Sequence, residues 1–235
     1  YDSLIGKLIV KNDTREEAVN AMTKALNATS VHGIETNLEY LRQIIASDVF
    51  ANAGAMSTSV LGDFSYRAPT IDVLTSGTQT TVQDHPGRIG YWEVGIPPSG
   101  PMDGLSFRLA NRILGNPNHA AGIEITVSGP TLQFNQDAEI ALVGAQLPVT
   151  LDGESISLGV AVKVSAGSIL KIGSGRAVAG VRTYLAIKGG LDVPDYLGSK
   201  STFTLGQFGG HGGRALRVGD VLHLSLIHIS EPTRL

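Results

Sequence analysis

The character of the sequence changes near residue 65, and this change constrains the fold more than any other feature. Before it, apolar residues recur at helical spacing behind a capping signal, Thr14 followed three residues later by Glu17. After it, short apolar runs alternate with most of the chain's 29 glycines. Glycine allows positive φ and close backbone approach, so many tight turns between short strands are expected. The sequence therefore predicts two different domains, neither complete, within a segment of a larger multidomain protein.

The first part, residues 1–50, predicts a strand over residues 1–10 and two helices. Thr14 caps the first helix, whose apolar face includes Ala18, Met22 and Leu26, and Gly33 ends that unit. The second helix begins after Thr36 or Asn37. Residues 51–70 show no periodicity, which predicts a linker.

The second part, residues 71–224, predicts a mainly-β domain with one helix. Asp103 caps this helix, Leu105, Leu109 and Ile113 form its buried face, and Gly115 ends it. Strands spaced by about eight to twelve residues are typical of a sandwich or barrel, and Asp152-Gly153 predicts a hairpin turn. The expected strands are 71–74, 80–83, 123–127, 131–134, 139–143, 149–151, 160–164, 169–172 and 182–187.

Composition excludes several classes of function. The net charge is −3, so no basic surface for nucleic acid is expected, and no apolar run is long enough for a membrane span. Cysteine is absent, which removes disulfides, thiolate metal sites and cysteine nucleophiles. The absence of cysteine fits a cytoplasmic protein.

Residues 225–235 interrupt the preceding pattern. They resemble translated sequencing-adapter sequence, which predicts a non-native tail that packs loosely. The alternative is a natural terminal extension.

Residues near the beginning resemble the C-terminal end of a biotin carboxylase domain. The matching segments are Tyr1 to Ile9, Ala21 to Leu26 and Gly33 to Asn37. The resemblance implies the α+β end of an ATP-grasp domain, with the ATP and Mg²⁺ ligands upstream of Tyr1. Tyr1, Asp2 and Lys7 are then scaffold residues.

The second part resembles the carboxyltransferase domain of urea carboxylases and a related group of KipA-like 5-oxoprolinase subunits. The segments that carry the resemblance are 77–84, 86–90, 95–103, 122–124 and 184–190. The resemblance implies an incomplete cyclophilin-like barrel.

The resemblance also implies a function. The parent protein is expected to be an ATP- and biotin-dependent ligase that converts urea, bicarbonate and ATP to allophanate, and this part is expected to transfer the carboxyl group from carboxybiotin to urea. Biotin would be carried on a domain absent here, and that carrier domain would be a partner of an oligomeric parent. The segment alone is expected to be inactive. A 5-oxoproline or guanidine-type substrate and a non-catalytic KipA-like regulatory module remain alternatives.

Asp84, His85 and Arg88 cluster around a Pro-Gly turn after a predicted strand. They are candidates for an acceptor of substrate N–H groups, a proton shuttle and a carboxylate clamp, because guanidinium binds carboxylate bidentately. Asp84 and Arg88 are assigned catalytic roles and His85 a substrate-binding role. The structural alternative is that Asp84 and Arg88 pair with each other and stabilise the turn.

Four further residues complete the candidate site. Glu124 lies in an otherwise apolar strand, so its carboxylate must be paired or functional, and it is assigned a catalytic role. Ser99 and Asp103 precede a helix N-terminus and His211 lies in a glycine-rich loop, and all three are assigned substrate binding. The structural alternatives are an N-cap for Asp103 and a solvated loop residue for His211. The scattered histidines show no metal-ligand spacing.

Overall fold

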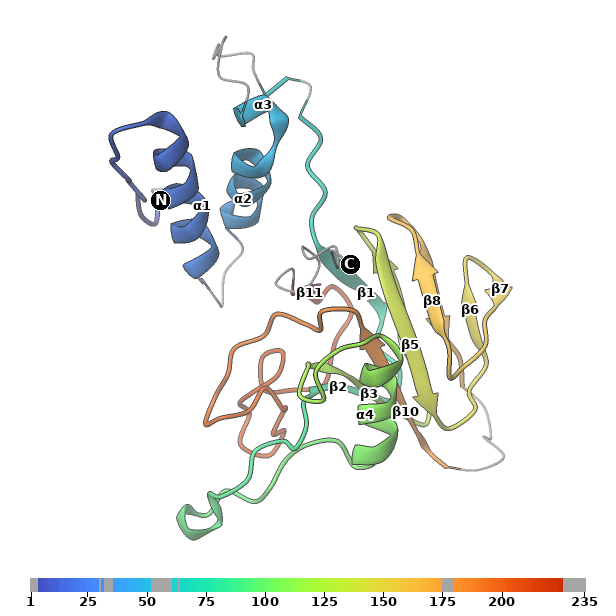
Figure 1. Ribbon diagram of the computed structural model, residues 1–235. Coiled ribbons are helices and arrows are strands. Elements are labelled where there is room, and N and C mark those ends of the chain that lie inside the picture. The colour runs from blue at the N-terminus through green and yellow to red at the C-terminus, as the bar shows by residue number, and fades with distance from the viewer. Residues whose placement is uncertain are drawn as a thin grey trace. The chain divides into compact units, whose positions relative to one another are not determined.

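The computed structural model describes residues 4–29, 31, 36–51, 61–62, 64–174 and 180–225. Contacts divide the chain into two compact units, Tyr1–Ala68 and Pro69–Leu235 (Figure 1). Tyr1, Asp2, Gly33 and the tail from Leu226 lie outside the described residues, as do the predictions made for them.

Two predicted helices form the first unit, together with one short helix that the sequence did not predict. They are α1 (Arg15–Ala28), α2 (Leu38–Ala46) and α3 (Asp48–Ala51). The capping box is confirmed, because the Thr14 hydroxyl accepts from Glu17 N while the Glu17 carboxylate accepts from Thr14 N. The Arg42 guanidinium of α2 donates to the carbonyl of Leu26 and so binds the end of α1.

The predicted strand over residues 1–10 is wrong for the described residues 4–10, which form no regular structure. An extended segment becomes a strand only when a neighbouring backbone pairs with it. Within the described part of the chain no strand lies beside this one, and Leu4, Ile5 and Ile9 are exposed.

The second unit contains two antiparallel sheets, as the spacing of apolar runs predicts. The first sheet has the order β11-β1-β4-β9-β6-β7 and the second has the order β2-β3-β10-β5-β8. Their inner faces form one apolar core that includes Ile71, Ile123, Leu132 and Ile187. The strands are β1 (Thr70–Thr75), β2 (Gln79–Gln83), β3 (Gly122–Thr126), β4 (Thr131–Phe134), β5 (Ala138–Gly144), β6 (Val149–Leu151), β7 (Glu154–Ser155), β8 (Ala161–Val164), β9 (Ile169–Ile172), β10 (Arg182–Ile187) and β11 (Val221–His223).

The helix α4 (Gly104–Ile113) covers the outer face of the second sheet, where Figure 1 shows it in green beside β3 and β10. Its start at Asp103 and its end at Gly115, with φ of +71°, are confirmed. Its predicted buried face is wrong, because Leu105 and Leu109 are exposed. The face that packs on the sheet consists of Phe107, Ala110 and Leu114, against Ala141, Tyr184 and Ala186.

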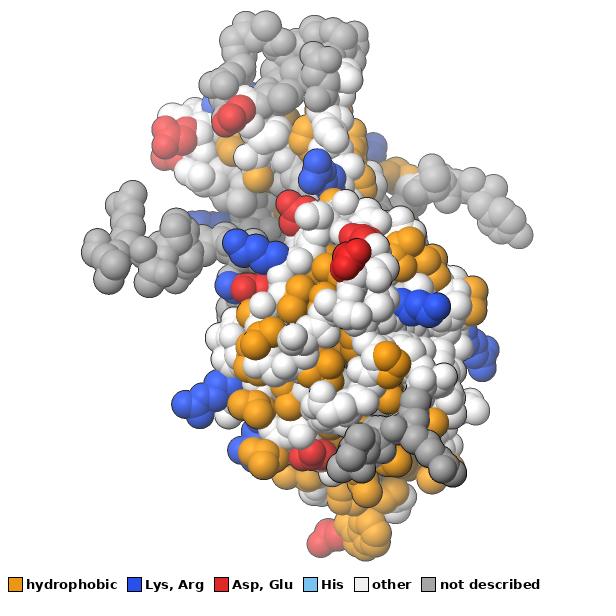
Figure 2. Space-filling model, turned by 90° about the vertical axis from the view of Figure 1, so that its right-hand side faces the viewer, with side chains coloured by type: hydrophobic (Ala, Val, Ile, Leu, Met, Phe, Trp, Pro, Cys, Tyr) orange, Lys and Arg blue, Asp and Glu red, His pale blue; other side chains and the backbone are white. Residues whose placement is uncertain are grey.

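A loop projects from this end of the unit. It runs from Arg88 to Ser99, contains the 3₁₀ helix η2 (Trp92–Val94) and is closed by paired backbone hydrogen bonds between Arg88 and Ser99; we call it the 88–99 hairpin. Ile89, Trp92 and Val94 are exposed on it, and Figure 2 shows hydrophobic side chains at this lower end of the molecule. Among the described residues, the longest helices are too short or too polar to cross a bilayer.

Candidate functional site

Asp84 follows β2 and is buried, with 8% of its surface exposed. Its carboxylate accepts from the hydroxyls of Ser199 and Ser201, both at 2.6 Å, and from Lys200 N at 2.9 Å. A buried carboxylate is tolerated only when such donors replace water. Asp84 therefore fastens the 199–201 loop to the end of β2.

Arg88 is almost completely buried, with 1% exposed. Its guanidinium packs over the rings of Phe208 and Tyr196, 4.9 Å and 6.0 Å from the ring centroids. Burial lowers the pKa of Arg88, an effect that Asp84 opposes. Its N–H groups donate to Tyr196 O at 2.9 Å, Ser99 Oγ at 2.9 Å, Ser201 O at 3.1 Å and Ser199 O at 3.1 Å.

These contacts define what the Asp84 and Arg88 side chains do in the fold. No ion pair joins the two within the described ranges, so they do not form the turn-stabilising pair considered above. Each binds the 196–201 loop, and Arg88 also binds Ser99 of the 88–99 hairpin. Together they hold this loop and the hairpin in fixed positions at the end of β2.

A second cluster lies on the outer face of the sheet, beneath the start of α4. Strand register places Thr81, Glu124 and Tyr184 side by side across β2, β3 and β10, and we call these three residues the polar row. Glu124 accepts from Met102 N at 2.7 Å and from Arg182 Nε at 3.1 Å. Its carboxylate is thus paired with a cation, as a buried charge in an apolar strand requires.

Tyr184 connects the polar row to the helix. Its hydroxyl accepts from Asp103 N at 2.7 Å. Burial raises the pKa of Tyr184, as does the neighbouring Glu124 carboxylate, although the bond from Asp103 N acts in the opposite direction. The phenol therefore stays protonated at neutral pH and keeps its own proton to donate.

Asp103 is the N-cap of α4, which confirms the structural alternative stated for it. Its carboxylate accepts from Leu105 N, Ser106 N and the Ser106 hydroxyl, and these bonds lower the pKa of Asp103. The helix N-terminus is thus already occupied by a carboxylate of the protein itself.

His85 adjoins the same helix start. A Cβ on Gly104 would lie 3.2 Å from the His85 ring, so the ring packs directly against the first turn of α4. Burial and the nearby Arg108 lower the pKa of His85, while Asp84 raises it. The imidazole is therefore uncharged near pH 7 and able to accept a proton. The fold thus brings His85, Asp103 and Glu124 together at one end of α4.

His211 belongs to a separate cluster in the glycine-rich loop. Its Nε2 lies 3.6 Å from Asp220, whose carboxylate also accepts two bonds from Arg214. Burial opposes ionisation of Asp220, but the bonds from Arg214 and from Arg217 N lower its pKa. The structure does not place His211 with the residues around α4.

The His211 cluster makes stability depend on pH. Burial lowers the pKa of His211 below 6.5, with Asp220 opposing and Arg214 and His223 adding to the effect. The unfolded state then binds a proton more readily, so stability is full above about pH 6.5 and falls as pH decreases through the folded pKa. We expect melting temperatures at pH 7.5, 6.5 and 5.5 to decrease, and His211→Gln to reduce that slope. An unchanged slope in His211→Gln, equal to that of the control His119→Gln at an exposed site, would contradict this account.

Residues that sequence reasoning missed include Tyr184, Arg182 and Gln83. The available signal was alternation: Thr81 and Gln83 are polar residues two apart in β2, which puts both on one face of the sheet. Their alignment with Glu124 depends on the register between β2 and β3, which the sequence does not reveal.

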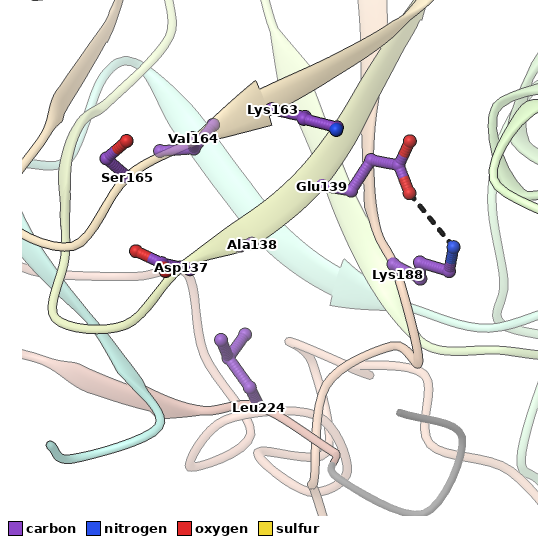
Figure 3. A pocket seen from close by; sticks show the side chains of 8 residues that line it. All are labelled: Asp137, Ala138, Glu139, Lys163, Val164, Ser165, Lys188 and Leu224. Atoms are coloured by element: carbon purple, nitrogen blue, oxygen red, sulfur yellow. Dashed lines mark hydrogen bonds and ion pairs between the residues drawn. The ribbon is translucent and has the colours of Figure 1, made fainter. Parts of the chain in front are cut away.

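Two surface pockets lie away from these residues. One of about 320 Å³ is shown in Figure 3, where Lys188 and Glu139 form an ion pair at 3.0 Å and Lys163 points towards the same carboxylate. The other, of about 370 Å³, is lined by the glycine-rich loop around Gly212 and Arg214. In the described ranges, no group of three or more His, Asp or Glu side chains could hold a metal ion.

Comparison with family models matches both units. Residues 94–234 match "Carboxyltransferase domain, subdomain A and B", and residues 1–63 match "Biotin carboxylase C-terminal domain". The junction between a carboxylase end and a carboxyltransferase domain thus lies within this chain.

Relatives and solved structures agree with this arrangement. The chain is 48% identical to urea amidolyase of Saccharomyces cerevisiae over 95% of its length and 40% identical to a putative urea carboxylase of Emericella nidulans over 96%. It spans only 12% and 18% of those relatives. The crystal structure of Kluyveromyces lactis urea carboxylase matches 94% of the chain and 19% of that protein, with a TM-score of 0.80 and 45% identity. A 5-oxoprolinase subunit of Haemophilus influenzae is 39% identical over 68% of this chain and 50% of its own.

Proposed function

Because the chain belongs to the carboxyltransferase domain family, subdomain A and B, and carries a biotin carboxylase C-terminal domain before it, we propose that it is part of a biotin-dependent urea carboxylase. In this proposal the parent enzyme converts ATP, bicarbonate and urea to allophanate. The second unit transfers the carboxyl group from carboxybiotin to urea. The 235 residues alone do not complete the reaction.

The observation that carries this proposal is that both domain types occur in one chain. Urea amidolyase aligns with 95% of the chain at 48% identity. The 5-oxoprolinase subunit aligns with 68%, so part of this chain has no counterpart in that alignment. A 5-oxoprolinase-like component is the second candidate, favoured by its 39% identity over the matched region.

We also propose the finer features that the resemblance implies. The first unit is the end of an ATP-grasp domain, whose upstream residues bind ATP and Mg²⁺. The second unit is a cyclophilin-like barrel, residues 51–70 link the two, and residues 225–235 are not native. The parent is oligomeric, cytoplasmic and dependent on its biotin carrier domain.

The chemistry of this chain's residues follows from the cluster at the start of α4. Carboxybiotin supplies the carboxyl group, and the urea nitrogen that receives it loses a proton. His85 is uncharged near pH 7 and adjoins α4, so it is suited to accept that proton and pass it on. Glu124 offers a fixed carboxylate to urea N–H groups and keeps the helix start in place through Met102 N.

Other predicted residues act around this cluster. Arg88 has four hydrogen bonds to protein acceptors, so its contribution to transfer comes through the position of the 88–99 hairpin and the 196–201 loop. Asp84 and Ser99 share that task, because Asp84 binds the loop and Ser99 binds Arg88. Asp103 contributes by capping the helix under which substrate binds.

The proposal is tested with the full-length biotinylated enzyme that contains this segment. We expect bicarbonate-dependent ADP formation to rise when urea is added and to be blocked by avidin. Guanidine and 5-oxoproline serve as competing substrates, and the 235-residue chain alone, expected to release no ADP, serves as a control. Stimulation by 5-oxoproline but not by urea would overturn the assignment in favour of the second candidate.

A further inference from the structure

Gln83, the last residue of β2, carries an unpartnered buried oxygen. The residue is 5% exposed, and its Oε1 has less than 1 Å² of accessible surface and no hydrogen-bond partner. Its Nε2 donates to Thr81 Oγ1 at 3.0 Å. Nearly all buried polar atoms in folded proteins are hydrogen-bonded, and turning the carboxamide around would only leave its nitrogen unpartnered instead.

The Gln83 carboxamide lies at the same sheet face as the polar row. Gln83 pairs with Gly122 of β3, and two residues earlier Thr81 pairs with Glu124. Gly122 adjoins Phe107 of α4, since a Cβ there would lie 3.3 Å from that ring. The unpartnered oxygen is thus beneath the first turn of α4, next to the acceptor Glu124.

We propose that Gln83 Oε1 accepts a hydrogen bond from an N–H of a ureido group, so that Gln83 and the polar row form a ureido-binding site at the start of α4. This inference rests on the proposed function and names the residues by which its substrate is recognised. A ureido group is flat and carries N–H donors beside one carbonyl oxygen. Gln83 and Glu124 supply acceptors for the N–H groups, and the protonated Tyr184 hydroxyl supplies a donor for the carbonyl.

Thr81 fixes the orientation of the carboxamide. Its hydroxyl accepts from Gln83 Nε2, so Oε1 is the end left for the ligand. Both atoms belong to buried side chains, so the carboxamide has no water to turn towards. The site therefore distinguishes ligands that donate N–H groups from ligands that only accept.

Entry to Gln83 Oε1 requires the segment Met102–Gly104 to lift. Two backbone bonds hold this segment to the polar row, Met102 N to Glu124 and Asp103 N to Tyr184, both 2.7 Å. The Met102 side chain is 75% exposed, so lifting the segment removes little apolar contact. The ligand then replaces the two bonds with its own.

Two sources of ureido group exist in the proposed reaction, urea itself and the ring of biotin. Gln83→Met in the full-length enzyme removes the acceptor while keeping length and apolar volume. Gln79→Met, an exposed glutamine on the same strand, is the matched control. If urea is the ligand, KM for urea rises about tenfold with kcat little changed, as expected for loss of one buried hydrogen bond. If the biotin ring is the ligand, kcat for transfer falls about tenfold and KM for urea stays the same.

Binding is measured independently of turnover by equilibrium dialysis of the unbiotinylated enzyme with labelled urea and with labelled biotin. We expect Gln83→Met to weaken one of the two by about tenfold and Gln79→Met to weaken neither. Equal binding and equal kinetics for the two variants would overturn the inference. If Gln83→Met does not fold, Thr81→Val frees the carboxamide to turn and should change the same parameter several-fold, and no change there would also overturn it. Urea turnover by the unaltered enzyme is measured first, so failure of the proposed function is distinguished from failure of this inference.

Discussion

Replacing Arg88 with methionine is expected to lower the free energy of unfolding by about 3–5 kcal/mol. Arg88 is 1% exposed, and its guanidinium donates to four acceptors in the 88–99 hairpin and the 196–201 loop. Methionine fills much of the same volume but leaves buried carbonyl groups without donors. It also removes the positive charge that lies near the buried Asp84 carboxylate and is stabilised by it.

Thermal unfolding followed by calorimetry measures this loss, with Arg112→Met on the exposed side of α4 as the control. The expected decrease in Tm for Arg88→Met is on the order of 10 °C. Arg112→Met should melt within about a degree or two of the unaltered protein, because exposed substitutions rarely change stability by more than about 0.5 kcal/mol. Identical melting of the two variants would show that Arg88 does not hold these loops together.

Gly87→Ala is expected to prevent the 88–99 hairpin from closing. Gly87 has φ of +88°, and a Cβ on it would lie 1.9 Å from Ser99 O, which is an impossible contact with backbone. The backbone bonds between Arg88 and Ser99, at 2.7 Å and 3.1 Å, would have to break to relieve it. Their loss would also separate Arg88 from the Ser99 hydroxyl.

Gly90→Ala is a matched control for the backbone conformation. Gly90 has φ of +91°, but nothing lies within 4 Å of the position its Cβ would take. Its cost should be about 1–2 kcal/mol, the usual strain of a left-handed non-glycine residue. Calorimetric melting should show Gly87→Ala less stable than Gly90→Ala by several kcal/mol, because a backbone clash is added to the same strain. Equal losses would mean that the hairpin can move away from the new methyl group at little cost.

Local signals predicted the parts of the fold that local chemistry decides. Thr14 and Glu17 form their capping box, Asp103 caps α4, and Asp152 and Gly153 adopt the positive φ values that a tight hairpin turn needs. Each depends on residues within four positions of one another. The strands followed for the same reason, except β7 and β11, which are too short to show alternation.

The parts that sequence reasoning missed depend on distant residues. In α4, Leu105 and Leu109 have the same helical spacing as Phe107 and Ala110, and only the position of the sheet decides which stripe is buried. Asp84 binds Ser199, 115 residues further along the chain, which no local pattern shows. The candidate site has the same origin, because Thr81, Glu124 and Tyr184 meet only through strand register.

The central claim, that the second unit transfers the carboxyl group at the start of α4, is tested most directly by Glu124→Gln in the full-length enzyme. The two half-reactions are measured separately: biotin-dependent ATP hydrolysis without urea, and urea-dependent formation of allophanate. Glutamine keeps the shape but removes the charge that accepts from Met102 N and pairs with Arg182, so transfer should fall about ten- to a hundredfold. Biotin-dependent ATP hydrolysis should stay normal in the same preparation, with Tm confirming an intact fold. Normal allophanate formation by Glu124→Gln would contradict the account and place the transfer site elsewhere.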